Sequence, residues 1–202
     1  CYKQNLLKKN LNKMSNITLG IIGGGKLGSM LAISAKKLNI KTVIYSDDSD
    51  APAQNFCNEF ISGNYNDNEK IIKFVNFVDY VTYEFENIPF ETLSEINRLK
   101  PVLPKPSVNR LLQHRLAEKD FINKLNIRTT RYASVENESE IEALEDLLPG
   151  ILKTTTLGYD GKGQYPIKSG DDLNSLNIDF SKGYILEKFV KLKKEISIII
   201  TR

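Results

Sequence analysis

The chain has 202 residues, of which 41% are hydrophobic and 26% charged, a composition ordinary for a soluble globular protein. No apolar run approaches the roughly 20 residues that a membrane-spanning helix needs, and no signal peptide opens the chain. The net charge of +3 comes from four lysines before Met14, which leaves −1 on the rest, so no nucleic-acid surface is expected. We therefore expect a cytoplasmic protein with no membrane or nucleic-acid partner.

Both ends of the chain look incidental to a folded domain. Met14 lies just before the first strong strand and fits a natural start, so residues 1–15 are expected to be a disordered basic extension. At the other end, residues 195–202 have the pattern of a β-strand that stops without a turn. We therefore expect the chain to be a fragment of a longer protein.

Strands and helices alternate through the first half of the chain. An apolar run at 17–23 ends in glycines, as a buried parallel strand should. The helix after it is expected to bury one apolar face, made of Leu27, Met30, Leu31, Ala35 and Leu38. Further strands are predicted at 41–46, 59–62, 79–85 and 102–103, with helices at 68–76 and 89–99. The alternation predicts a doubly wound, Rossmann-like α/β domain with a parallel sheet, over residues 16–109.

The pattern changes after a cluster of prolines at 101, 104 and 106, which marks a boundary. One long helix is expected at 107–125 with Ser107 as its N-cap, and the single histidine, His114, is expected to be a surface or packing residue. The elements predicted after it are a helix at 138–148 and strands at 128–133, 151–154, 164–167, 184–190 and 195–201. Short strands with few helices indicate an antiparallel α+β domain over residues 110–202, which we expect to be incomplete.

A first glycine loop, GGGKLG at 23–28, follows a strand, opens a helix and fits the pattern G-x-G-x-x-G. Glycines let the backbone turn tightly, and the free N–H groups at the start of the helix face an anion. Asp47, just past the second strand, fits the position that contacts an adenosine ribose in dinucleotide enzymes. This loop alone leaves three interpretations open: a nicotinamide or flavin cofactor, another phosphorylated ligand, or packing of the helix on the strand.

A second glycine loop, LGYDGKGQ at 157–164, places three glycines around an aromatic, an acid and a base. Such a loop can fold over a polyphosphate with its N–H groups and the charge of Lys162, although a plain β-turn with a polar tip is an alternative. Lys153 ends an apolar strand just before the loop. A buried lysine needs an anionic or hydrogen-bonding partner, and a nucleotide phosphate would be one. Downstream, Glu187 and Lys188 interrupt one apolar strand and Glu195 opens another, which indicates a nucleotide held between two sheets.

The order of these features resembles the ATP-grasp superfamily. More narrowly, the chain resembles the 5-(carboxyamino)imidazole ribonucleotide synthases, ligases of purine biosynthesis, from about residue 17 to its last residue. Four segments carry the resemblance: GGGKLGSM (23–30), YEFENIP (83–89), QHRLAEKDF (113–121) and GYDGKGQ (158–164), the last being the most specific. The resemblance implies a Rossmann-like pre-ATP-grasp domain followed by an incomplete ATP-grasp domain.

The resemblance also implies the ATP-binding residues. Arg115 would reach the phosphates of ATP, and Lys153 would contact the adenine ring and the α-phosphate. A lid would cover the phosphates, formed by Gly158, Tyr159, Asp160, Gly161, Lys162, Gly163 and Gln164. Glu195 would hold the ribose hydroxyls, and a hinge strand would contact the adenine through its backbone, formed by Glu187, Lys188, Phe189 and Val190.

On the substrate side, the resemblance implies that the first glycine loop binds the phosphate of 5-aminoimidazole ribonucleotide through Gly24, Gly25, Lys26 and Leu27. Glu84 and Glu86 would lie near this substrate, although they can also be solvated acids at a strand end. Within the lid, Tyr159, Asp160 and Lys162 would face the substrate as well, and Asp160 and Lys162 are the catalytic candidates. The chain departs from the family at Lys26, where glutamine is usual, and at Ser29, where arginine is frequent.

The implied reaction converts ATP, bicarbonate and 5-aminoimidazole ribonucleotide into the N-carboxylated ribonucleotide, ADP and phosphate. The resemblance implies Mg²⁺ with ligands beyond residue 202, a homodimer when full length, and no activity for the fragment alone. A formate-dependent glycinamide ribonucleotide transformylase or a biotin carboxylase would share most of these parts. A nicotinamide-dependent oxidoreductase and a non-catalytic nucleotide-binding module remain as further alternatives.

Overall fold

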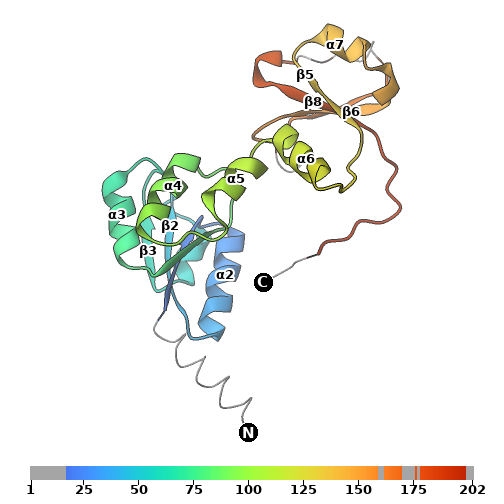
Figure 1. Cartoon of the computed structure of the whole chain (residues 1–202). Helices are drawn as coiled ribbons and strands as arrows, with labels where there is room; N and C mark the ends of the chain where they lie inside the picture. The colour runs from blue at the N-terminus through green and yellow to red at the C-terminus, as the bar shows by residue number, and fades with distance from the viewer. Residues whose placement is uncertain (1–16, 159–161, 170–175, 177, 199–202) are drawn as a thin grey trace. The chain divides into compact units, whose positions relative to one another are not determined.

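The chain folds into two compact units in the computed structural model, residues 1–111 and 112–202, each with its own hydrophobic core (Figure 1). The structure describes residues 17–158, 162–169, 176 and 178–198. The extension predicted at 1–15 lies outside these residues. The two units are described separately below.

The first unit is built on a parallel sheet in the order β3-β2-β1-β4. Its strands are β1 (Thr18–Ile22), β2 (Lys41–Ser46), β3 (Glu59–Ser62) and β4 (Tyr80–Tyr83). Its helices are α2 (Lys26–Lys37), the short 3₁₀ helix η1 (Pro52–Asn55), α3 (Asn68–Asn76) and α4 (Phe90–Leu99). The predicted Rossmann-like alternation is confirmed. The fifth strand, expected at 102–103, is reduced to a single parallel bridge between Val102 and Val81.

The apolar face predicted for α2 was right only at Ala35. The helix buries Gly28, Ser29, Ala32 and Ala35, whereas Leu27, Met30, Leu31 and Leu38 are between 38% and 56% exposed. The physical reason is the close approach of the helix to the loop after β1, since a Cβ atom on Gly28 would lie 2.4 Å from the carbonyl oxygen of Gly23. Only small side chains fit between the helix and the sheet at this distance, so the large ones point outward.

The second unit contains an entirely antiparallel sheet in the order β5-β8-β6-β7. Its strands are β5 (Tyr132–Val135), β6 (Gly150–Thr154), β7 (Gln164–Ile167) and β8 (Tyr184–Lys188). Its helical segments are α6 (Arg115–Lys124), α7 (Glu138–Glu142), η2 (Glu145–Leu147) and η4 (Phe180–Lys182). Figure 1 shows α6 and α7 on opposite sides of this sheet. The predicted antiparallel α+β arrangement is confirmed.

The single long helix predicted at 107–125 was wrong, because the chain forms two helices there, α5 (Pro106–Leu112) and α6. The two helices are anchored to different units. In α5 the buried Asn109 side chain donates a hydrogen bond to the Ile88 carbonyl, whereas the Arg115 N–H that opens α6 donates to the Thr155 carbonyl. His114 has extended backbone, and its Nδ1 accepts a hydrogen bond from the Ala117 N–H, so this histidine is the N-cap of α6.

Other predicted elements also differ from those in the structure. The strand expected from Arg128 begins only at Tyr132, and the helix expected at 138–148 ends at Glu142 before the short η2. Leu148 is extended because it precedes Pro149, and a residue before proline avoids the helical region. The strand expected from Glu195 does not form over 195–198, since no strand among the described residues pairs with this segment.

Candidate nucleotide and substrate sites

The two faces of the second sheet are chemically different, because successive side chains of a strand point to opposite faces. Leu152 and Leu186 pair across β6 and β8 and are fully buried in the hydrophobic core. The opposite face carries Lys153 from β6 and Glu187 from β8. In register, Lys153 pairs with Ile185 and Ile151 pairs with Glu187, so the lysine and the glutamate are diagonal neighbours on one face.

Glu187 is the centre of a partly buried group of charges. Its Oε2 accepts a hydrogen bond of 3.0 Å from the Lys153 ammonium, and its Oε1 lies 3.3 Å from the ammonium of Lys119 on α6. The exposed fractions of the side chains are 9% for Glu187, 15% for Lys119 and 20% for Lys153. The structure thus gives Lys153 the anionic partner that a buried lysine requires.

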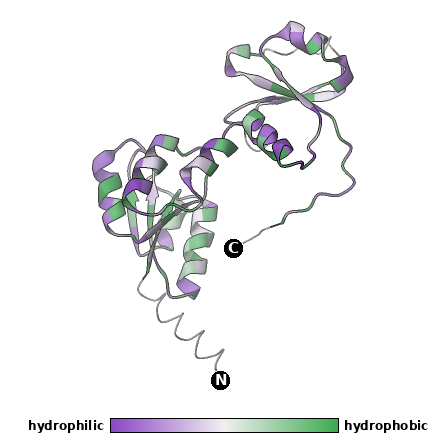
Figure 2. Cartoon of the chain, in the orientation of Figure 1, coloured by the Kyte–Doolittle hydropathy of each residue, from purple (hydrophilic) through white to green (hydrophobic). Residues whose placement is uncertain are grey.

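Lys119 is the member of this group of charges that was not among the predicted site residues. It lies in QHRLAEKDF, one of the four segments that carry the resemblance, but no role was given to it. The available signal was its spacing, since Lys119 follows Arg115 by four residues and both extend from one side of a helix. Figure 2 shows α6 as a largely hydrophilic helix, and none of its residues is buried, which fits a helix that carries charges rather than core side chains.

Arg115 holds the start of the second glycine loop. Its guanidinium donates to the carbonyl of Thr154 at 2.9 Å and to the carbonyl of Gly158 at 2.7 Å. A Cβ atom on Gly158 would lie 2.7 Å from Nη1 of Arg115, so a larger residue there would push the guanidinium aside and disturb this contact. The planar guanidinium therefore joins the end of β6 to the beginning of the loop.

The far end of the loop is anchored on the same residue of β6. The Thr154 N–H donates to the Gly163 carbonyl at 2.9 Å, and Gly163 has a positive φ of 67°. Gln164 begins β7 and pairs with Lys153, so the loop closes a β-hairpin between β6 and β7. Lys162 is exposed, and Tyr159, Asp160 and Gly161 lie outside the described residues.

The predicted hinge strand is only partly regular, since β8 ends at Lys188 and not at Val190. The Lys188 ammonium turns away from the Glu187 face and donates to the Asp146 carbonyl at 2.7 Å, while the Phe189 N–H donates to the Pro149 carbonyl. Phe189 and Val190 are about half exposed. Glu195 is exposed too, and among the described residues it has no hydrogen bond or ion pair with the lysine–glutamate group.

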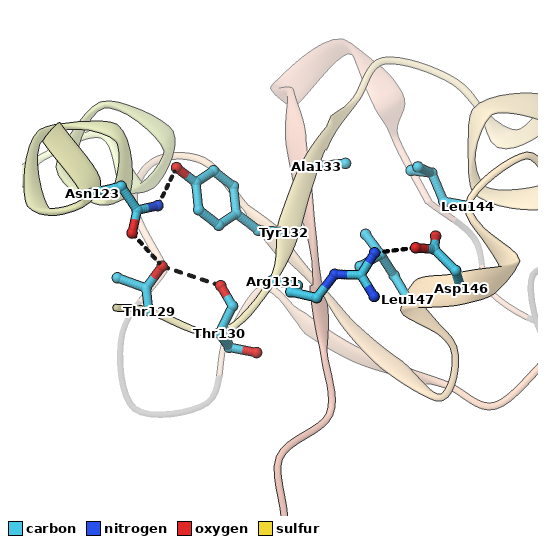
Figure 3. Close-up of a pocket in the computed structure, with 9 residues that line it drawn as sticks. All are labelled: Asn123, Thr129, Thr130, Arg131, Tyr132, Ala133, Leu144, Asp146 and Leu147. Carbon is cyan, nitrogen blue, oxygen red and sulfur yellow. Dashed lines mark hydrogen bonds and ion pairs between the residues drawn. The ribbon is translucent and has the colours of Figure 1, made fainter. Parts of the chain in front are cut away.

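A cavity of about 370 Å³ lies beside β5, and Figure 3 shows its lining. Arg131 and Asp146 form an exposed ion pair at one side of the cavity. At the other side the Asn123 amide donates to the Tyr132 hydroxyl at 2.9 Å and accepts from the Thr129 hydroxyl. None of the predicted nucleotide-binding residues lines this cavity, whereas Lys153 and Glu187 lie together on one face of the second sheet.

In the first unit, a carboxylate occupies the first glycine loop. The Gly25 N–H donates to Oε1 of Glu84 at 3.1 Å. Gly23 has a φ of 106°, and a Cβ atom there would lie 2.7 Å from both Cγ and Oε1 of Glu84. A pyrophosphate bound at the Gly25 amide would meet this carboxylate, and like charges at such a distance repel. The loop geometry therefore argues against a dinucleotide cofactor.

Asp47, the other basis for a dinucleotide, has a partner within the protein. The Asp47 carboxylate lies near the hydroxyl of the partly buried Tyr65. Burial raises the pKa of Tyr65 far above its ordinary value, and the Asp47 and Glu84 carboxylates raise this pKa further. Glu84 and Asp47 therefore lie near one tyrosine hydroxyl at the carboxyl ends of β4 and β2, where parallel sheets bind their ligands.

The start of α2 has no side-chain cap. Gly25 is the N-cap and provides no side-chain hydrogen bond, while the first N–H groups of any helix lack partners within the helix. Lys26 and Leu27 are exposed in this first turn. Glu86 is exposed as well, at the end of the YEFE segment. The predicted substrate residues of the first unit thus gather at one end of its sheet.

Within the described residues, no group of three or more His, Cys, Asp and Glu side chains could hold a metal ion. The same part of the chain contains no helix long and apolar enough to cross a membrane. The residues that the structure describes therefore do not fit a Mg²⁺ site by themselves.

Two family models match the chain. Residues 16–113 match the ribonucleotide synthetase preATP-grasp domain, and residues 120–202 match the ATP-grasp domain. Residues 114–119, which include Arg115 and Lys119, lie between the two matches.

Named relatives agree with the family models. The bifunctional purine synthesis protein purC/E of Dictyostelium discoideum is 37% identical over 192 residues, which are 92% of this chain and 19% of that protein. The N5-carboxyaminoimidazole ribonucleotide synthase of Brucella melitensis is 36% identical over 190 residues, 92% of this chain and 52% of that protein. The Staphylococcus aureus N5-carboxyaminoimidazole synthetase complexed with ADP has a TM-score of 0.80 at 33% identity, covering 88% of this chain and 48% of that one. The chain spans about half the length of the synthases that it matches.

Proposed function

Because the chain belongs to the ATP-grasp superfamily, we propose that it carries the ribonucleotide-binding and ATP-binding parts of a carbon–nitrogen ligase. The reaction is the ATP-dependent carboxylation of 5-aminoimidazole ribonucleotide with bicarbonate, in purine biosynthesis. The relatives named as N5-carboxyaminoimidazole ribonucleotide synthases support this substrate. The cytoplasmic location and the homodimer stay predictions.

One observation carries the ATP assignment. Lys153 lies on the polar face of the sheet, and the next residue, Thr154, anchors both ends of the glycine loop through Arg115 and Gly163. A triphosphate covered by this loop would therefore lie next to the Lys153 ammonium. Backbone N–H groups of a glycine loop and a lysine ammonium are the usual partners of nucleotide phosphates.

The first step proposed is phosphoryl transfer. An oxygen of bicarbonate attacks the γ-phosphorus of ATP, the bond to the β-phosphate oxygen breaks, and ADP and carboxyphosphate result. Lys153 and Lys162 are the cations that neutralise the charge on the phosphates. The family resemblance implies Mg²⁺ as well, but the described residues contain no site for it, so no step is assigned to the metal.

The second step is carbon–nitrogen bond formation. The exocyclic amine of the ribonucleotide attacks the carbon of carboxyphosphate, phosphate leaves, and the amine nitrogen loses a proton. Asp160 is the carboxylate of the loop that can accept this proton, an assignment that rests on sequence alone. Enclosure by the loop from Gly158 to Gln164 would protect carboxyphosphate from water.

The ribonucleotide itself is assigned to the first unit. Its phosphate would bind at the first turn of α2, to the Lys26 side chain and to N–H groups of the Gly24–Leu27 segment other than that of Gly25, which donates to Glu84. Glu84 and Glu86 would accept hydrogen bonds from its hydroxyl or amine groups. The Glu84 carboxylate disfavours a pyrophosphate. In this arrangement it would instead lie beside the neutral part of the substrate.

The test is ADP release by the full-length protein with ATP, Mg²⁺ and bicarbonate, with and without 5-aminoimidazole ribonucleotide. We expect release that depends on this ribonucleotide and is abolished by Lys153→Ala but not by Lys124→Ala, which changes an exposed lysine on α6. Release that requires glycinamide ribonucleotide and formate would reassign the protein to the transformylase. No release with either substrate would contradict the ligase proposal.

A further inference from the structure

Among the residues that the structure describes, the charges in contact with Glu187 do not balance. One carboxylate is shared by two ammonium groups, at 3.0 Å from Lys153 and 3.3 Å from Lys119, so this group of three described side chains carries a surplus of +1. All three side chains are largely shielded from water. An uncompensated charge in such a place is costly, and a bound anion would offset that cost.

Lys119 is held in place from several sides. Its ammonium lies 5.5 Å from the centre of the Tyr132 ring, over which it makes a cation–π contact. Tyr132 is the cross-strand neighbour of Glu187 in the β5–β8 register, so the ring and the carboxylate share one face of the sheet. The Tyr132 hydroxyl donates to Asp120 at 2.7 Å and accepts from Asn123 at 2.9 Å, and the Asn123 contact is drawn in Figure 3. A ring fixed in this way restricts where the Lys119 ammonium can lie.

The arrangement decides how much positive charge Lys153 can offer to a ligand. If Glu187 faced Lys153 alone, the pair would be neutral, and an approaching phosphate would meet the carboxylate as well as the ammonium. With Lys119 on the other oxygen, the carboxylate is already neutralised, and the charge of Lys153 is left for the ligand.

We propose that Lys119 is a positioning residue of the nucleotide site, which acts through Glu187 to leave the positive charge of Lys153 available to the phosphates of ATP. This inference rests on the proposed function, because it takes Lys153 as a nucleotide ligand. Lys119 does not contact the nucleotide itself. Its effect is therefore electrostatic and passes through the Glu187 carboxylate.

The test is a double-mutant cycle on ADP binding by the full-length protein, measured by calorimetry. Lys119→Met should weaken ADP binding about tenfold, the size of one charge-assisted contact, because the surplus charge falls to zero. Lys119→Met combined with Glu187→Gln restores the surplus of +1 and should recover most of the affinity. Lys119→Arg should retain it, and Lys124→Met, on the exposed side of the same helix, should leave it unchanged.

Other readouts separate this role from a general structural one. The KM for ATP should rise in Lys119→Met while the KM for the ribonucleotide stays the same, and the thermal midpoint should stay near that of the wild type. Unchanged ADP affinity in Lys119→Met would overturn the inference. A loss that Glu187→Gln does not repair would also overturn it, since Lys119 would then act by direct contact or through the fold. Absence of ADP binding in the wild type would instead contradict the proposed function.

Discussion

The Gly25 N–H donates a hydrogen bond of 3.1 Å to Oε1 of Glu84, a residue 59 positions further along the chain. The contact places a negative charge inside a glycine loop whose sequence alone fits a phosphate-binding loop. Parallel pairing of β1 with β4 produces this contact, because it brings the ends of the two strands together. The loop therefore binds the Glu84 carboxylate of the protein itself. Only the N–H groups in the first turn of α2 can still bind an anion.

The Glu84 contact leads to a prediction that separates stability from binding. Glu84→Ala should destabilise the protein by about 1 kcal/mol, because the Gly25 N–H loses its acceptor in a partly buried place. Glu84→Gln keeps an acceptor oxygen and should change stability little, but it removes the charge and should raise the KM for 5-aminoimidazole ribonucleotide. Steady-state kinetics and urea unfolding would measure the two effects, with Glu95→Gln on the exposed side of α4 as the control. An unchanged KM in both variants would refute the role of Glu84 in substrate binding.

Gly28→Ala should test the close packing of α2. The added Cβ atom would lie 2.4 Å from the Gly23 carbonyl oxygen, which is backbone and cannot move aside easily. We expect a loss of about 1–3 kcal/mol in the free energy of unfolding, the usual cost of overpacking. Ser34→Ala, an exposed change in the same helix, should stay within about 0.5 kcal/mol. Equal stabilities of the two variants would show that the helix can shift without cost.

Arg115→Lys should loosen the start of the second glycine loop while it keeps the charge. A lysine ammonium cannot reproduce the planar fork that joins the carbonyls of Thr154 and Gly158. We expect faster amide hydrogen exchange over residues 154–158 and roughly tenfold weaker ADP binding. Arg128→Lys, an exposed position after α6, is the matched control. Exchange rates equal to those of the wild type would mean that the guanidinium does not hold the loop.

Tyr45 should make the first unit sensitive to alkaline pH. Burial, with smaller contributions from the Asp67 and Asp47 carboxylates, raises the pKa of Tyr45 from 10.0 to about 12. Because the folded pKa is raised, its contribution to stability is complete below pH 10 and is lost as the pH rises toward about 12. Tyr65 acts in the same direction, since its pKa is raised as well.

Urea unfolding measured between pH 10 and pH 12 would test this contribution. Tyr45→Phe should start from a lower stability, since it loses the hydrogen bond to the Asn64 carbonyl, but should decline less steeply across this interval. Tyr80→Phe, at a position 43% exposed, should decline like the wild type. Parallel curves for Tyr45→Phe and the wild type would contradict the assignment of the pH dependence to Tyr45.

Local sequence was sufficient where a structure depends on neighbouring residues. The apolar runs at β1 and β2, each followed by a helical pattern, predicted the parallel sheet, because only a crossover can join such strands. The position of the loop from Gly158 to Gln164 after Lys153 was also predicted from local sequence, because a hairpin brings together residues that are close in sequence. The nucleotide-binding roles of these residues remain predictions.

Tertiary structure alone decided the contacts between distant segments. The small-residue face of α2 follows from how closely the helix meets the Gly23 carbonyl, a distance that no helical periodicity contains. The helix predicted at 107–125 is interrupted before Arg115, because the Arg115 N–H donates a hydrogen bond to the Thr155 carbonyl and not to a carbonyl of the preceding helix. Lys119 contacts Glu187 because α6 lies over the face of the sheet that carries this glutamate. The antiparallel register places Tyr132 beside Glu187 on the same face. The hydrophobic periodicity of a sequence indicates which side of a helix or strand is apolar. The partner of a buried charge depends on tertiary packing, which involves residues from the whole chain.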